Sequence, residues 1–177
     1  MKRGDALTLS TLRGTVHLGA HADGANHYGV EAPSIDEMPI DHYLGVCEVI
    51  SCESAAGRRL TIQDLRQPVD AERILLKTGT WPDSTLFNTD FAGLSVELVE
   101  HLAQRGVRTI GIDTPSVDVA DSKDLPAHRA ILKHNIAILE CLDLTDVPPG
   151  AYELIALPLK LVGFDASPVR AVLRTID

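Results

Sequence analysis

The chain is poor in cysteine and has no long apolar run. Its 177 residues include only Cys47, Cys52 and Cys141, an odd number without a CxxC pair. This pattern argues against a disulfide framework and favours the reduced thiols of a cytoplasmic protein. We expect these cysteines to be small residues of the hydrophobic core. No stretch approaches the roughly 18 consecutive apolar residues of a membrane span. Residues 1–10 contain basic residues but no apolar signal-peptide region. We therefore expect a cytoplasmic protein with no membrane partner.

Positive charge is also scarce. The chain has 16 Lys and Arg against 25 Asp and Glu, which gives a formal net charge of −9. The closest basic pairs, Lys2-Arg3 and Arg58-Arg59, are too small to neutralise a phosphate backbone, so nucleic acid is not an expected partner. Neither GxxxxGK[ST] nor GxGxxG occurs in the sequence, and this argues against a phosphate-binding loop.

Aromatic residues make up only 4% of the chain. An aryl-binding wall would therefore depend on very few side chains. Trp81, Phe87 and Phe91 lie in one predicted loop and are the candidates for such a wall. The alternative is that these rings anchor the loop to the core.

The length and the 45% apolar content predict one globular domain that spans residues 1–177. Apolar periodicity predicts strands or extended segments at 6–12, 15–23, 42–52, 72–79, 107–113, 136–144, 152–164 and 168–176. It predicts helices at 94–106 and 125–134. Since helices fall between strands, the expected fold class is α/β with a mixed sheet, which the segment 168–176 would close.

The segment HLGAHADGANH, residues 17–27, combines three histidines and an aspartate with small residues. On an extended chain His17, His21 and Asp23 share parity and project from one side, whereas a helix would turn Asp23 away. Two imidazoles and a carboxylate that converge can bind Zn²⁺ or Mn²⁺. His27 is close enough to lean over the same site. The alternative is a chance pair of surface histidines at HxxxH spacing.

A second pair of candidates lies far along the chain. His128 falls in the first turn of the second predicted helix, and Glu140 falls near the end of the following strand. A helix start and a strand end can face one cavity, and a carboxylate often bridges two ions. Taken separately, His128 could be a surface residue and Glu140 a carboxylate satisfied by a neighbouring strand.

Three segments in the same order support a family resemblance: HLGAHADGANHY, GIDTPSVD at 111–118, and AHRAILKHNIAILECL at 127–142. They resemble segments of the cyclase-like metal-dependent hydrolases, whose best-known members are bacterial kynurenine formamidases. The resemblance runs from about Leu7 to the C-terminus. It implies a single domain of the swivelling β/β/α type, in which helices flank a mixed, partly barrel-like sheet, and it implies a homodimer.

The resemblance also implies the roles of individual residues. Two metal ions per chain would be bound, either zinc or manganese. The implied ligands are His17, His21, Asp23, His128 and Glu140. Asp23 would bridge the two ions, Glu140 would complete the second set, and His27 would occupy the catalytic position.

The chain departs from the family pattern at three points. Ala20 stands where the family usually has threonine, and the turn DGANH lacks the proline that usually stiffens it. Family members also begin with an additional segment, which the resemblance associates with an aromatic side of the substrate pocket. This chain begins late in that pattern. The resemblance therefore implies either that the sequence is a truncated product, which lacks an N-terminal segment, or that the substrate pocket is open on one side.

The implied activity is hydrolysis of N-formyl-L-kynurenine to L-kynurenine and formate, a step of tryptophan breakdown. A metal-bound hydroxide, formed because the ion lowers the pKa of water to roughly 7, would attack the carbonyl carbon. His27 would deliver a proton to the departing nitrogen. Two alternatives remain: hydrolysis of another amide or a cyclic substrate such as isatin, and a catalytically silent metal-binding protein.

Overall fold

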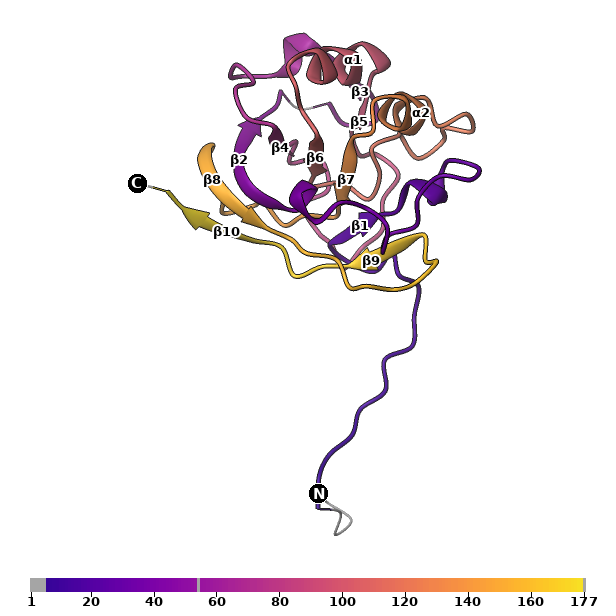
Figure 1. Ribbon diagram of the computed structural model, residues 1–177. Helices are drawn as coiled ribbons and strands as arrows, with labels where there is room; N and C mark the ends of the chain where they lie inside the picture. The colour runs from indigo at the N-terminus through magenta and orange to yellow at the C-terminus, as the bar shows by residue number, and fades with distance from the viewer. Residues whose placement is uncertain (1–5, 54, 177) are drawn as a thin grey trace.

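The computed structural model describes residues 6–53 and 55–176 (Figure 1). The strands are β1 His21–Asp23, β2 Leu44–Ser51, β3 Arg59–Leu60, β4 Arg73–Lys77, β5 Gly93–Leu94, β6 Thr109–Ile112, β7 Ala137–Glu140, β8 Gly150–Ile155, β9 Ala166–Pro168 and β10 Val172–Thr175. The α-helices are α1 Val96–Gln104 and α2 Pro126–Lys133. Short 3-10 helices span Ala25–His27, Ile40–His42 and Ile62–Asp64. Among the described residues, no helix is long and apolar enough to cross a membrane.

Eight strands form one mixed sheet in the order β10-β8-β2-β4-β6-β7-β1-β9. Strands β2, β4, β6 and β7 run parallel, whereas β8, β10, β1 and β9 pair antiparallel with their neighbours. β9 and β10 lie at opposite edges of the sheet, although only residues 169–171 separate them in the chain. The sheet must curl to bring its two edges together. Figure 1 shows this curvature, and the predicted α/β fold with a partly barrel-like sheet is confirmed.

The central strands are apolar on both faces because both faces are covered. On β4, Ile74 and Leu76 pack beneath the helices, whereas Leu75 points into the concave side of the sheet. A parallel strand buried on both faces loses the simple alternation of polar and apolar residues. The two resulting cores lie back to back, and the sheet separates them.

Helix α1 has its own signals for beginning and ending. The Ser95 hydroxyl accepts a hydrogen bond from the Leu98 amide at 3.1 Å, and Gly106 follows the helix with a positive φ of 83°. Leu98 and Leu102 lie on its buried face. Helix α2 lacks such an N-cap, since Leu125 at that position has φ 44° and no capping side chain. The first turn of α2 must therefore be capped from elsewhere in the fold.

The predicted strands at 6–12 and 152–164 differ from the structure. Residues 6–12 form no strand, and residues 6–15 are exposed. Their alternating apolar pattern has no partner strand among the described residues, so no ladder can form. The predicted strand 152–164 is shorter than expected, because β8 ends at Ile155 and residues 156–165 form a loop that leads to β9. The segment 168–176 does reach the sheet edge, as β10.

The hydrogen bonds of the Asp64 carboxylate provide a test of what stabilises the fold. Its carboxylate accepts hydrogen bonds from the Thr61 amide and hydroxyl at 2.7 and 2.8 Å, and from the Arg58 guanidinium at 2.6 and 2.9 Å. The Arg58 guanidinium, aided by Thr61, holds the pKa of this carboxyl well below its usual range. A lowered pKa stabilises the fold above the unfolded-state pKa, and this contribution is lost as the pH falls.

We expect Asp64→Asn to lower the free energy of unfolding by about 1–2 kcal/mol at neutral pH. The difference from the wild type should shrink as the pH falls below about 4, where the unfolded carboxyl takes up its proton. Urea unfolding at several pH values measures both effects. Asp70→Asn, which removes an exposed ion pair with Arg105, is the control and should change little. A pH-independent loss for Asp64→Asn would contradict this account.

Candidate metal centre

Short segments from distant parts of the chain bring the predicted ligands together. His21 and Asp23 lie on β1 and point to the same side of the sheet, as the period of two requires. His21 is paired directly with Glu140 across the antiparallel β1–β7 ladder, so these two side chains also share a side. His128 comes from the first turn of α2. The four side chains are buried.

His17 reaches the site by a route that differs from the sequence prediction. The strand spans only His21–Asp23, and the chain bends between residues 16 and 20, where Gly19 has a positive φ of 61°. The parity argument for His17 was therefore wrong, although the predicted convergence occurs. The bend at a residue that tolerates positive φ turns the His17 ring back towards Asp23.

The two oxygens of Asp23 face different partners. Oδ1 lies 3.4 Å from His17 Nδ1 and 3.4 Å from His21 Nε2. Oδ2 lies 3.9 Å from His128 Nε2, which in turn is 3.8 Å from Glu140 Oε1. The other oxygen of Glu140 is 3.4 Å from His21 Nε2. One carboxylate therefore stands between two groups of candidate ligands, which is the arrangement of a bridging ligand.

These atoms fit a divalent cation. Ligand atoms 2.0–2.2 Å from a tetrahedral zinc ion stand roughly 3.3–3.6 Å apart, and the contacts at Asp23 Oδ1 measure 3.4 Å. Both Asp23 oxygens and His21 Nε2 are buried without a hydrogen-bond partner among the described residues. Buried polar atoms are almost always satisfied. The convergence of the Asp23 oxygens and His21 Nε2, all without such a partner in the described part of the chain, is therefore the expected sign of a metal site.

The ring nitrogens that face away from the centre are all held by oxygen acceptors. His21 Nδ1 lies 2.8 Å from the Gly19 carbonyl, His128 Nδ1 lies 2.8 Å from Asp118, and His17 Nε2 lies 3.1 Å from Asp165. Metal-binding histidines commonly donate their second N–H to such an acceptor, which fixes the tautomer and the orientation of the ring. The same pattern at all three histidines leaves one nitrogen of each ring for the ion.

Asp118 was not identified as a site residue from the sequence. Its carboxylate accepts hydrogen bonds from the backbone amides of Ala127 and His128 at 3.2 and 3.1 Å, and so supplies the N-cap that α2 lacks. Arg59 pairs with the other side of the carboxylate. Burial alone would raise the pKa of Asp118, but hydrogen bonds from His128 and Arg59 lower it to about 2. The only sequence signal was its place at the end of GIDTPSVD.

His27 and Asp165 extend the cluster towards solvent. The His27 and His17 rings are 4.3 Å apart between centroids, and the His27 ring is 6.3 Å from that of His128. His27 Nδ1 lies 3.4 Å from Asp165 Oδ2. The sequence predicted that His27 leans over the site, and the structure places it there. The sequence contained no signal for Asp165, which lies 148 positions from His17.

Burial and charge act against each other within the centre. Burial alone would lower the pKa of His21, but Asp23, Cys141 and Glu140 raise it to about 12. Burial would raise the pKa of Asp23, but His17 and His21 hold it below its usual range. For Glu140, burial and the nearby Asp23 charge raise the pKa. Two buried carboxylates need compensating positive charge, and a divalent cation would supply it.

The remaining histidines lie outside the centre. Nδ1 of His42 is 2.7 Å from the Arg108 carbonyl, and burial lowers the pKa of the His42 ring. Nε2 of His134 is 2.7 Å from Glu100, which joins the end of α2 to α1. His101 lies in α1. The contacts of His42 and His134 therefore join parts of the fold away from the candidate ligands.

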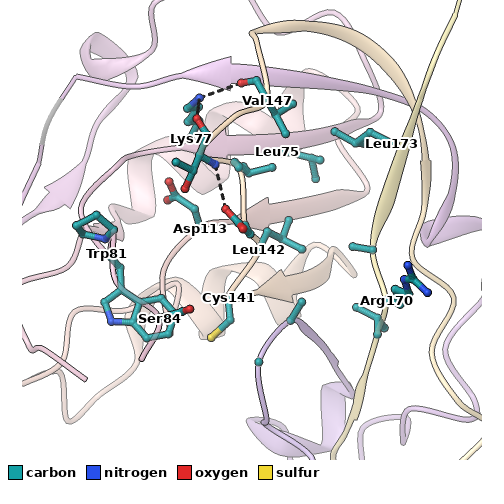
Figure 2. A pocket seen from close by; sticks show the side chains of 18 of the residues that line it. Leu75, Lys77, Trp81, Ser84, Asp113, Cys141, Leu142, Val147, Arg170 and Leu173 are labelled. Carbon is teal, nitrogen blue, oxygen red and sulfur yellow. Dashed lines mark hydrogen bonds between the residues drawn. The ribbon is translucent and has the colours of Figure 1, made fainter. Parts of the chain in front are cut away.

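A cavity of about 990 Å³ adjoins the centre through Gly19, Ala20 and Cys141. Leu75, Leu142, Trp81 and Ser84 are among the residues that line it (Figure 2). Cys141 is therefore not a core cysteine, unlike Cys47 and Cys52.

The candidate aryl wall of three rings does not form. Phe91 is buried in the protein interior, whereas Phe87 is 73% exposed. Only Trp81 of the three lines the cavity. Phe91 thus anchors its loop, as the alternative interpretation proposed, and Trp81 alone is placed to meet a ligand.

The family described as "Putative cyclase" matches residues 5–119, which is more than half of the chain. The chain belongs to this cyclase family. Solved structures agree over nearly the whole length. A "potential metal-dependent hydrolase with cyclase activity" is 29% identical with a TM-score of 0.82, and the match covers 90% of this chain and 79% of that one.

Two further solved structures are similar. A predicted metal-dependent hydrolase from Bacillus stearothermophilus is 30% identical, with a TM-score of 0.79 and coverage of 95% of this chain and 82% of the other. Isatin hydrolase A from Labrenzia aggregata is 26% identical, with a TM-score of 0.78 and coverage of 98% and 79%.

The central position of Asp23 makes a direct prediction. We expect Asp23→Ala to abolish binding of zinc at both groups of ligands, because its two oxygens serve one group each. His27→Ala should leave metal binding unchanged. Equilibrium dialysis against zinc, with metal content measured by atomic emission, tests both variants. Asp143→Ala, at an exposed position, is the control. Loss of metal from His27→Ala would show that His27 is itself a ligand.

Proposed function

We propose that the protein is a metal-dependent hydrolase that cleaves the C–N bond of a small aromatic amide. The observation that carries this proposal is the bridging position of the buried Asp23, with both oxygens directed at candidate ligands and without hydrogen-bond partners. Membership in the cyclase family and similarity to proteins described as metal-dependent hydrolases support the same class.

The residues of the centre would have different roles in hydrolysis. His17, His21 and Asp23 would hold one ion, and His128 and Glu140 would hold a second with Asp23 as the bridge. Zinc or manganese at this centre would supply a Lewis acid and lower the pKa of bound water. Hydrolysis adds hydroxide to the carbonyl carbon and breaks the C–N bond.

The departing amine nitrogen needs a proton, because an amide anion is a poor leaving group. His27 is the candidate donor, since its ring is 37% exposed and lies against His17 at the edge of the centre. An imidazole can accept a proton at one step of a reaction and donate it at the next.

The leading substrate is N-formyl-L-kynurenine, which would give L-kynurenine and formate. The cavity beside the centre supports an aromatic substrate, because its apolar wall and Trp81 offer a surface for an aryl ring. A formamide carbonyl on such a ring would then lie towards Ala20 and Cys141, next to the candidate ligands.

A cyclic amide is the second candidate. The support is the similarity to isatin hydrolase A, which covers 98% of this chain. Ring opening of isatin is the same C–N hydrolysis, except that the amine stays attached to the product. A catalytically silent metal-binding protein remains the outcome if neither substrate turns over.

Turnover separates these candidates. We expect the protein loaded with zinc or manganese to hydrolyse N-formyl-L-kynurenine and the chelated protein to be inactive. Activity against isatin, measured in parallel by absorbance, decides between the open-chain and the cyclic amide. His27→Ala should reduce kcat by roughly 10²–10⁴-fold with metal content unchanged. Metal-independent turnover would contradict the proposed mechanism.

The cavity makes a separate prediction about substrate binding. We expect Trp81→Ala to raise KM for the active substrate by roughly tenfold, because a stacked aryl contact contributes about 1–1.5 kcal/mol. The metal content should not change. Phe87→Ala is the matched control from the same loop, since this ring is 73% exposed and does not line the cavity. Equal effects of the two variants would show that the substrate binds elsewhere.

A further inference from the structure

The Asp165 carboxylate lies between two imidazoles of different proposed function. Its Oδ2 is 3.1 Å from Nε2 of His17 and 3.4 Å from Nδ1 of His27. These three side chains form a compact group at the edge of the metal centre. Asp165 comes from the loop before β9, which the curled sheet brings beside β1.

This group is better explained as a hydrogen-bonded support than as another cation site. His17 Nδ1 faces Asp23, so an ion at the centre would take Nδ1 of the neutral ring. The proton of that ring then sits on Nε2 and points at Asp165. A cation between Asp165 and His17 would require the ring to lose this proton as well. An acceptor at Asp165 needs no such deprotonation.

The same carboxylate also constrains His27. Nδ1 is the His27 ring nitrogen that lies 3.4 Å from the carboxylate, so this contact favours the tautomer that carries its proton on Nδ1. Nε2 is then the nitrogen left to exchange a proton with a substrate. The contact with the His17 ring limits how far the His27 ring can rotate.

We propose that Asp165 is a positioning residue that sets the orientation and tautomer of His17 and His27 together. It couples the geometry of a metal ligand to that of the proton donor, so that the two rings are oriented by one carboxylate. The proposal rests on the proposed function in one respect, which is that His17 binds an ion through Nδ1.

The Asp165 side chain is not needed to hold its loop in place. The loop is fixed by backbone hydrogen bonds: the Gly24 amide donates to the Asp165 carbonyl at 2.8 Å, and the Ile35 amide donates to the Phe164 carbonyl at 3.0 Å. The Asp165 side chain itself is 48% exposed. Substitution of this side chain should therefore leave the fold intact.

The first test measures zinc affinity by competition with a chromogenic chelator. We expect Asp165→Ala to weaken zinc binding roughly 10- to 100-fold, the usual effect of removing the acceptor behind a metal-bound histidine. Asp165→Asn keeps an acceptor oxygen and should restore part of the lost affinity. Unchanged affinity in Asp165→Ala would overturn the proposal.

Asp36→Ala is the matched control for the loop. Asp36 accepts hydrogen bonds from the Gly163 amide at 2.9 Å and the Ser34 hydroxyl at 2.7 Å. It therefore ties down the same loop without touching either histidine. The zinc affinity of the Asp36→Ala variant should equal that of the wild type. A loss as large as that of Asp165→Ala would show that only the loop matters, and would also overturn the proposal.

Nitrogen-15 NMR of the imidazole rings in the zinc-loaded protein reports the tautomers directly. We expect the wild type to show His17 protonated at Nε2 and His27 protonated at Nδ1, and Asp165→Ala to lose the fixed tautomer of His27. An unchanged His27 tautomer in that variant would overturn its part of the proposal. Failure of the wild type to bind zinc would instead contradict the proposed function, so the two failures are distinguishable.

Discussion

The organisation of this protein depends on one buried carboxylate. Asp23 is 1% exposed, and neither of its oxygens has a hydrogen-bond partner among the described residues. A charged group in this position is costly unless positive charge compensates it. His17, His21 and His128 surround it, and Glu140 adds a second negative charge to the cluster. The site is therefore built to be completed by a cation, and the surrounding fold serves to hold its ligands in place.

Sheet register and helix capping provide that support. The β1–β7 ladder sets His21 opposite Glu140, and the β1–β9 ladder sets Asp23 opposite Ala166, the residue after Asp165. Asp118 caps α2 and also orients the His128 ring. Each structural contact thus has a second effect on the geometry of a candidate ligand. Because these contacts are shared, the precision of the centre is linked to the stability of the elements around it.

The sequence predicted the candidate ligands because their chemistry is concentrated in short segments. HLGAHAD contains three of them, and the His128 to Glu140 segment contains the other two. The alternating pattern of residues 6–12 led to a wrong strand prediction. Alternation shows only that a strand is possible, whereas a strand also needs a neighbouring strand to pair with. The aryl wall failed for a similar reason. Loop residues close in sequence, such as Phe87 and Phe91, can have opposite exposures.

The sequence by itself determined the class of domain, the residues able to bind a metal, and the central β-α alternation. Periodicity was enough for the class of domain and the alternation, and local composition indicated His17, His21 and Asp23. The roles of His128 and Glu140 were instead implied by the family resemblance. Only the tertiary structure decided that Gly19 bends His17 back to the site, that Asp118 caps α2, and that Asp165 stands between His17 and His27. These contacts join residues through a chain bend, a helix end and a curled sheet. No local pattern encodes them, because they depend on how distant strands pair.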